Sequence, residues 1–375
     1  MIETTLVILL FLTFAYYLAF LWRVWLGLGR TVLPSTTSTP RVSVIVAARN
    51  EERTIEQCLH ALVHQDYDAK LFDIIVVDDH SSDRTSLVAR EYSQRNPQPR
   101  IHLLSLKGAL DTYGKPAAIA RGVEAATGEI ILCTDADCVV PQGWIRSMAG
   151  CFGSSVAFVA GPVIERRHEG LLTRLESLEF LGLLTTAAGL IGSKAPIICN
   201  GANIAYRKKS FEDVGGYGDG STSCDDETLM QRMILRKVGD VVFNADPLAT
   251  VSTSTPASAR EFWNQRTRWA AKRGRYESAM ILARLLGLYF FFVTLLVTSL
   301  SAIALPSFGP SVLAVFLLKG IFEYMVLRSG SRLFSYDFGL SDFLIAELLH
   351  VPYIVFAAAI GQLQSMSWKG RTLHR

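Results

Sequence analysis

Two acidic side chains end an apolar run near the middle of the chain. Residues 130–140 read IILCTDADCVV, so Asp135 and Asp137 follow a segment apolar enough for a buried strand, with only Ala136 between them. Carboxylate oxygens are ligands that Mg²⁺ and Mn²⁺ prefer, and these ions often bind phosphate oxygens as well. The pair is therefore a candidate site for a divalent cation that holds phosphates. The alternative interpretation is a turn that Asp135 caps.

Two other apolar runs also end in acids. Segment 42–52, VSVIVAARNEE, leads to Glu51, and segment 73–83, DIIVVDDHSSD, contains Asp78 and Asp79. Carboxylates gathered in one cleft repel one another unless a cation compensates their charge. The second cluster also has a local interpretation, as an N-cap of the helix that follows it. Whether the clusters meet depends on the arrangement of the strands.

The pattern of residues 41–137 predicts that the three clusters do meet. Four continuous apolar runs alternate with three segments whose apolar residues recur at helical spacing. Such alternation is typical of a parallel sheet covered by helices on both faces, an α/β fold. Ligands of these sheets bind at the carboxyl ends of the strands, where the acidic clusters fall. The expected strands are 42–50, 73–79, 100–106 and 129–137, and the expected helices are 52–65, 81–94 and 114–128.

The composition indicates membrane segments at both ends of the chain. Half of the 375 residues are hydrophobic, and the formal net charge of +3 is too small to favour a nucleic-acid partner. Six isolated cysteines without a CxxC pair indicate neither a zinc ribbon nor a disulfide framework. The stretches long enough to cross a bilayer are 5–26, 283–305, 311–327 and 343–363. A fifth apolar segment, 171–192, predicts either an interfacial or a core helix.

Basic residues near these stretches predict their orientation. Arg23, Arg30 and Arg41 follow the first stretch, and a basic group between Arg268 and Arg284 precedes the second. The apolar stretches predict a multi-pass protein of the cell (inner) membrane. Because loops rich in Lys and Arg stay on the cytoplasmic side, we expect the middle of the chain to lie in the cytoplasm. Three C-terminal spans place the basic tail, 368–375, on the other side, against this rule, so either one of the later stretches is re-entrant or interfacial or the tail is an exception. The expected divisions are an anchor at 1–33, a globular domain at 34–278 and a membrane region at 279–375.

Residues 41–275 resemble the family 2 glycosyltransferases. The segments already quoted, together with CNGANIAYRK (199–208), CDDETLMQRM (224–233) and QRTRW (265–269), follow the order and approximate spacing of that family's motifs. The resemblance implies a GT-A fold, a nucleotide-binding α/β sandwich with a mostly parallel sheet. It also implies a nucleotide-diphosphate sugar as donor, with a UDP-sugar favoured, and a divalent cation, Mg or Mn. The apolar stretches are similar to those of membrane-anchored members that glycosylate lipids or polymerise polysaccharides.

The resemblance assigns a role to each acidic cluster. In the family a carboxylate accepts a hydrogen bond from the imide N–H of uracil or guanine, a role that suits a group that is purely an acceptor. This carboxylate matches Asp79, and Asp78 could share the role. Asp137 matches the direct metal ligand, and Asp135 the residue that contacts ribose or completes the metal site. The donor nucleotide is expected beside Glu51 and Lys115. The alternative interpretation of Lys115 is an ordinary surface lysine at the start of a helix.

Two later motifs match the acceptor side of the family's site. The acidic pair Asp225 and Asp226 matches the position of the catalytic base. Asp226 is the first choice for the base and Asp225 is the rival. The alternative interpretation is that these acids only complement the dipole of the helix that they begin. Asn203 matches a loop around the donor or acceptor sugar. Gln265, Arg268 and Trp269 match a Q-x-x-R-W signature, in which Arg268 neutralises the diphosphate and the other two border the acceptor.

The expected function is an inverting, metal-dependent transfer of a sugar to a lipid or lipid-linked acceptor at the cytoplasmic membrane face. The nearest alternative is a processive polysaccharide synthase, of the type that makes cellulose, chitin, hyaluronan or poly-N-acetylglucosamine, and it usually needs more membrane helices. A non-catalytic membrane scaffold would be expected to lose acidic clusters, all of which are present here. A dehydrogenase is disfavoured because no G-x-G-x-x-G follows the first strand.

Overall fold

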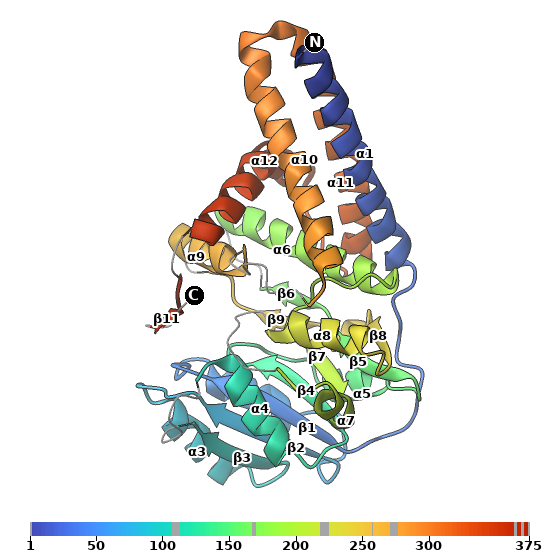
Figure 1. Ribbon diagram of the computed structural model, residues 1–375. Coiled ribbons are helices and arrows are strands. Elements are labelled where there is room, and N and C mark those ends of the chain that lie inside the picture. Colours follow the sequence, from blue (N-terminus) through green and yellow to red (C-terminus); the bar gives the residue numbers. More distant parts are fainter. Residues whose placement is uncertain are drawn as a thin grey trace.

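The structure is a computed structural model that describes most of the chain. The residues it describes are 2–106, 113–166, 170–217, 225–256, 258–270, 277–363, 366–368 and 371–373. An α/β part holds the strands, and a column of long helices rises from one side of it (Figure 1). The N-terminus lies at the far end of that column.

Within the described residues, seven strands form one mixed sheet in the order β3-β2-β1-β4-β7-β5-β8. The four expected strands are confirmed, and they are mutually parallel. Beyond β4 the sheet becomes mixed, because β7 runs antiparallel to both neighbours and β8 is parallel to β5. The strands are β1 Val42–Ala48, β2 Phe72–Asp78, β3 Arg100–Ser105, β4 Ile130–Asp135, β5 Val156–Ala160, β7 Ile204–Arg207 and β8 Asp240–Phe243.

Helices cover both faces of the parallel half, as predicted. Successive side chains of a strand point to opposite faces. Val44 and Val46 of β1 accordingly pack in the core that contains α2 and α3, whereas Ile45 packs against α4. Both faces are therefore buried, which explains why the strand is apolar throughout. The helices are α2 Ile55–Val63, α3 Thr85–Arg95 and α4 Lys115–Ala125.

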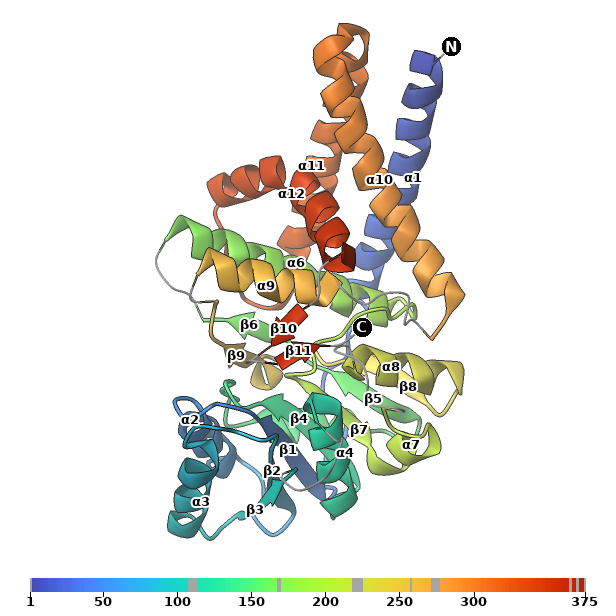
Figure 2. The same ribbon diagram turned by 60° about the vertical axis from the view of Figure 1, so that its left-hand side comes forward.

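A second layer lies over the carboxyl ends of these strands. A short parallel pair, β6 Val163–Glu165 and β9 Val251–Thr253, leads towards α6 Leu171–Gly192 and α9 Ala259–Ala270. Figure 2 shows α6 and α9 side by side beneath the long helices. The remaining elements are α5 Trp144–Ala149, α7 Lys208–Asp213, α8 Asp225–Leu235, η1 Pro247–Ala249, η2 Pro306–Phe308 and the pair β10 Met366–Trp368 and β11 Arg371–Leu373.

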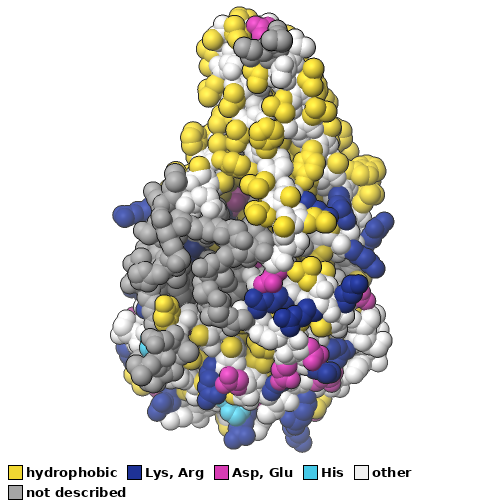
Figure 3. Space-filling model, in the orientation of Figure 1, with side chains coloured by type: hydrophobic (Ala, Val, Ile, Leu, Met, Phe, Trp, Pro, Cys, Tyr) yellow, Lys and Arg dark blue, Asp and Glu magenta, His cyan; other side chains and the backbone are white. Residues whose placement is uncertain are grey.

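Five helices of the described chain are long and apolar enough to cross a membrane. Four of them correspond to the four stretches expected from the sequence and are α1 Ile2–Leu28, α10 Ala279–Ala304, α11 Gly309–Leu333 and α12 Leu340–Leu363. Hydrophobic side chains cover the outside of the column that they form, while charged side chains gather on the α/β part (Figure 3). These features indicate a membrane protein.

The fifth apolar helix, α6, is mostly buried. It crosses α1 at two glycines, since a Cβ on Gly27 would lie 1.8 Å from the Gly189 carbonyl oxygen and a Cβ on Gly189 would lie 2.4 Å from the Val24 carbonyl oxygen. Small residues allow such close approach of two helices. Of the two interpretations of segment 171–192, the structure thus favours a helix buried between the column and the α/β part.

Candidate active site

A cleft of about 500 Å³ opens where the parallel strands end, between the sheet and the α6–α9 layer. Carboxyl ends of parallel strands are the usual ligand position in α/β sheets. Nine of the residues singled out from the sequence line this cleft, and they are Glu51, Asp79, Lys115, Asp135, Asp137, Asp226, Gln265, Arg268 and Trp269. Asp78 is not among its lining residues. Asp225 begins α8, but its side chain lies outside the described part of the structure.

Lys115 connects two of the acidic clusters. Its Nζ lies 2.7 Å from Asp135 Oδ1 and 3.8 Å from Asp226 Oδ2. Lys115 is the first residue of α4, and the preceding Gly114 has a φ of 94°, a conformation that favours glycine. The turn before α4 thus brings a cation between carboxylates from β4 and α8, which reduces their mutual repulsion.

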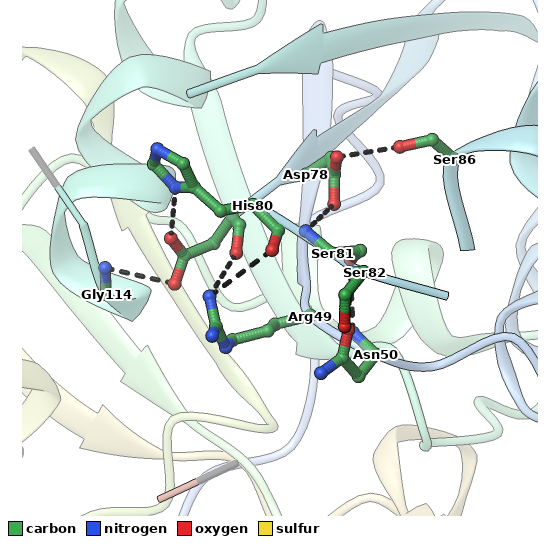
Figure 4. Close-up of polar contacts among 9 residues, drawn as sticks. Arg49, Asn50, Asp78, His80, Ser81, Ser82, Ser86 and Gly114 are labelled. Atoms are coloured by element: carbon green, nitrogen blue, oxygen red, sulfur yellow. Dashed lines mark hydrogen bonds and ion pairs between the residues drawn. The ribbon is translucent and has the colours of Figure 1, made fainter. Parts of the chain in front are cut away.

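Asp79 holds this turn in place and is almost fully buried. Its Oδ2 accepts a hydrogen bond from the Gly114 backbone nitrogen at 3.0 Å, and its Oδ1 lies 3.0 Å from His80 Nδ1 (Figure 4). Arg49 Nη1 donates to the Asp79 carbonyl oxygen at 2.8 Å. Asp79 therefore lies where the ends of β1, β2 and α4 meet.

Asp78, the neighbour of Asp79, is used within its own strand–helix turn. Its Oδ1 accepts from the Ser81 backbone nitrogen at 3.0 Å, and its Oδ2 accepts from Ser86 Oγ at 2.7 Å (Figure 4). Both oxygens thus stabilise the start of α3. This position favours the local, structural interpretation of Asp78 over contact with a ligand in the cleft.

The β4 end has a donor set that fits a hard divalent cation. Ligand atoms of Asp135, Asp137 and Cys138 all lie within 4.8 Å of one another. The buried Cys138 thiol donates towards Asp137 Oδ1 at 3.6 Å, and burial, with the two carboxylates, raises its pKa well above the usual value. A protonated thiol is a poor ligand, so the usable donors are carboxylate oxygens. Carboxylate oxygens suit Mg²⁺ and Mn²⁺.

A glycine that sequence reasoning missed gives Asp226 access to the cleft. A Cβ on Gly201 would lie 1.7 Å from Asp226 Oδ2, so the carboxylate or the loop would have to shift. The glycine therefore lets the loop before β7 pass beside this carboxylate in its present position. The signal was present in the quoted segment 199–208, but the sequence alone does not show which side chain the glycine approaches.

Asn203, in the same segment, does not border the cleft. It is fully buried, and its Oδ1 accepts from Trp144 Nε1 at 2.9 Å. Its Nδ2 donates to the carbonyl oxygens of Pro162 at 2.8 Å and Ala249 at 2.7 Å. These internal bonds use the Asn203 amide, whereas Asn200, Gly201 and Ala202 of the same loop line the cleft.

The comparisons with known proteins agree with this geometry. The family model described as Glycosyl transferase family 2 matches residues 43–215, and the model described as Glycosyl transferase family group 2 matches residues 130–327. The chain belongs to glycosyltransferase family 2. Its acidic strand ends and the QRTRW helix thus lie within segments that the family models cover.

Curated relatives of this family 2 chain include one glycolipid synthase and one polysaccharide synthase. It is 29% identical over 242 residues to the beta-monoglucosyldiacylglycerol synthase of Synechocystis, which covers 63% of this chain and 48% of the relative. It is 26% identical over 234 residues to the poly-beta-1,6-N-acetyl-D-glucosamine synthase of Staphylococcus aureus, covering 61% of this chain and 53% of the relative. The chain spans about half the length of these curated relatives.

One solved structure shares the fold along nearly the whole chain. It is the mannosyltransferase PcManGT of Pyrobaculum calidifontis in complex with GDP-Man and Mn²⁺, with a TM-score of 0.63 and 20% sequence identity. The match covers 97% of this chain and 99% of that one. The predicted GT-A fold with flanking apolar helices is thereby confirmed.

The roof of the cleft is apolar and comes from α6. Phe180, Leu183, Leu184 and Ala187 of this helix line the cleft opposite the charged strand ends. The family 2 chain therefore has a cleft with a charged floor and an apolar roof. The roof helix also packs against α1, α11 and α12 of the column.

Glu165, which lines the cleft, and Arg266, which does not line it, were not singled out from the sequence. Glu165 lines the cleft although only 3% of it is exposed, and burial raises its pKa to about 7 even though Arg266 acts to lower it. Arg266 itself is 3% exposed and lies inside the QRTRW segment, between Gln265 and Arg268. No local pattern marks either residue, because their burial depends on the packing of α6 against α9.

Proposed function

We propose that this family 2 chain transfers a sugar from a nucleotide-diphosphate sugar to a lipid or lipid-linked acceptor, with inversion and with the help of a divalent cation. The observation that carries the proposal is the two-sided cleft, in which acids and Lys115 face an apolar helix beneath the membrane column. A charged floor suits a nucleoside diphosphate, and an apolar roof suits an amphiphile.

The donor is proposed to bind at the ends of β1, β2 and β4. Asp79 accepts a hydrogen bond from the imide N–H of the base, for which its position at the β2 end is suited. Glu51 lies beside the nucleotide, and Asp135 contacts ribose. Lys115, already paired with Asp135, adds a positive charge for the diphosphate.

Asp137, with Asp135, is proposed to hold Mg²⁺ or Mn²⁺. When bound there, the cation would neutralise negative charge on the diphosphate as it leaves. Arg268 on α9 also lines the cleft and offers a fork of donors to phosphate oxygens. These residues together favour departure of the nucleoside diphosphate.

Asp226 is the proposed general base. It lies in the first turn of α8, lines the cleft, and its Oδ2 is 3.8 Å from Lys115 Nζ. A carboxylate there can take the proton of an acceptor hydroxyl that attacks the sugar from the side opposite the leaving group. A single displacement of this kind inverts the configuration at the sugar.

The acceptor is proposed to enter from the membrane side. Gln265 and Trp269 border the cleft near the apolar α6 roof, so a lipid-linked hydroxyl could reach Asp226 while its apolar part stays under the column. Arg23 near the end of α1, and Arg30 and Arg41 after it, favour a cytoplasmic position for residues 34–278.

A processive polysaccharide synthase is the second candidate, supported by the Staphylococcus aureus relative. Against it stands the number of membrane helices, since α1, α10, α11 and α12 leave little material in the described chain for a translocation channel.

The test is to incubate the full chain in membranes with UDP-, GDP- and dTDP-sugars and Mn²⁺ or Mg²⁺. Nucleotide release that rises with added lipid extract, together with a short product on a sizing column, supports the proposal. Long polymer would favour the synthase. No release from any donor would favour the scaffold. Asp137→Ala should abolish transfer without unfolding the protein, and an active Asp137→Ala variant would refute the metal assignment.

A further inference from the structure

We propose that Arg266 is a positioning residue that ties the acceptor wall of the cleft to membrane helix α12 through Glu179 and Tyr353. The inference rests on the proposed function and concerns how the QRTRW helix is held. Arg266 does not line the cleft, and only 3% of it is exposed. A buried guanidinium must be paired and hydrogen-bonded to be tolerated, so its partners show what it holds together.

On the cleft side, Arg266 contacts two residues proposed to border the acceptor. Its Nη1 donates to Gln265 Oε1 at 2.5 Å, and its guanidinium lies over the Trp269 ring, 4.4 Å from the centroid. A cation at this distance from an aromatic face is attracted to it. Arg266 thereby restrains the side chains of both Gln265 and Trp269.

On the membrane side, Arg266 contacts a carboxylate of α6. Its Nε and Nη2 lie 2.8 Å and 2.6 Å from Glu179 Oε2. The other oxygen, Glu179 Oε1, accepts from Tyr353 Oη at 3.1 Å. Glu179 therefore contacts Arg266 of α9 with one oxygen and accepts a hydrogen bond from Tyr353 of α12 with the other.

Aromatic packing supports the same link. The Tyr353 ring is stacked on Phe262 with centroids 6.0 Å apart and meets Trp263 edge-on at 6.4 Å. Phe262 in turn lies under the Arg266 guanidinium, 4.6 Å from it. Two consecutive residues of α9 thus contact one tyrosine of α12, and Figure 2 shows α12 above α6 and α9.

Lysine cannot replace Arg266 in this arrangement. The contacts to Glu179 and Gln265 use three different nitrogens of a planar fork, and a lysine offers one nitrogen. Glu165 Oε1 lies 3.9 Å from Arg266 Nη2, so the guanidinium also faces a second buried carboxylate. Loss of the fork therefore disturbs α9 even where the positive charge is kept.

A change at Arg266 should affect the acceptor end and the donor end of the cleft differently. The proposed base, ribose and metal positions are built by β1, β2, β4 and α4, whereas α9 contributes Arg268 to the diphosphate. A change at Arg266 or Tyr353 should therefore slow transfer to the acceptor much more than it weakens nucleotide affinity. A defect that only unfolded the protein would reduce both.

The experiment compares Arg266→Lys and Tyr353→Phe with the wild-type full chain in lipid nanodiscs. Arg260→Lys is the matched control, because Arg260 lies on the same helix and is exposed. We measure nucleotide affinity, nucleotide release with lipid extract, and hydrogen exchange of residues 259–270. Arg266→Lys should slow release by roughly tenfold, within the range for coupled contacts. Tyr353→Phe should slow it less, and both should speed exchange in α9.

A double-mutant cycle separates positioning from general stability. If Arg266 acts through Gln265, Arg266→Lys should slow release clearly less in a Gln265→Ala background than in the wild type. Normal release and normal α9 exchange in Arg266→Lys would overturn the inference, as would equal losses in both backgrounds or a loss of nucleotide affinity as large as the loss of release rate. A wild-type protein that releases no nucleotide would instead refute the proposed function, while α9 exchange in the variants would still test the tie itself.

Discussion

A methyl group at Gly201 should disable the proposed base without touching the donor site. The Cβ of Gly201→Ala would lie 1.7 Å from Asp226 Oδ2, whereas real Cβ contacts stay beyond 3.0 Å, so the carboxylate or the loop must retreat by about 1.3 Å. A misplacement of about 1 Å in a reacting group can cost on the order of 100-fold in rate. That loss corresponds to roughly 2.7 kcal/mol of barrier height.

The assay is the initial rate of nucleotide release with donor, Mn²⁺ and lipid extract, alongside nucleotide affinity without acceptor. We expect the rate to fall about 100-fold and the affinity to stay within a factor of about two, because the nucleotide is proposed to bind at the strand ends. Gly153→Ala is the matched control, since nothing lies within 4 Å of the position its Cβ would take. A Gly201→Ala variant that transfers sugar at the wild-type rate would refute the assignment of Asp226 as the base.

Three further changes test other parts of the structure. Asp137→Asn should weaken Mn²⁺ binding by at least roughly tenfold, measured by titration without turnover; unchanged Mn²⁺ affinity would exclude Asp137 as a ligand. Lys319→Met removes the buried cation that lies 2.8 Å from both Glu323 and Glu347, so the free energy of unfolding in nanodiscs should fall by about 3–5 kcal/mol and recover in part with Glu347→Gln. An unchanged melting temperature in Lys319→Met would contradict this reasoning. Burial raises the pKa of Glu165 from 4.5 to about 7, so the folded state keeps a proton that the unfolded state loses, and stability should decline as the pH rises between these values. Glu165→Gln should flatten that decline in melting temperature, and an identical pH dependence in variant and wild type would count against it.

The parallel half of the sheet could be predicted from the sequence for a local physical reason. Strands buried on both faces, such as the one containing Val44, Ile45 and Val46, must be apolar throughout, and their helices carry their own periodic pattern. The antiparallel β7 was not predicted, because it is four residues long and its pairing with β4 and β5 joins segments far apart in the chain.

The distinction between Asp78 and Asp79 needed the structure. Successive side chains of a strand point to opposite sides, so one of the two had to face away from any ligand. Which one does so depends on the turn that holds Ser81 and Ser86 against Asp78 and Gly114 against Asp79. Asn203 shows the same limit, since a polar residue in a matching motif proved to be an internal hydrogen-bonding centre.

The sequence by itself thus determined the chemistry available to this protein: acids at the ends of apolar strands, a basic aromatic helix segment, and apolar stretches at both ends. These features are local, since each depends on residue type and spacing within a short segment. The tertiary structure alone decided which of them meet. Lys115 lies between Asp135 and Asp226, Gly201 admits Asp226, and Arg266 joins α9 to α6. Such contacts unite segments up to about a hundred residues apart, and packing rather than any local pattern sets their distances.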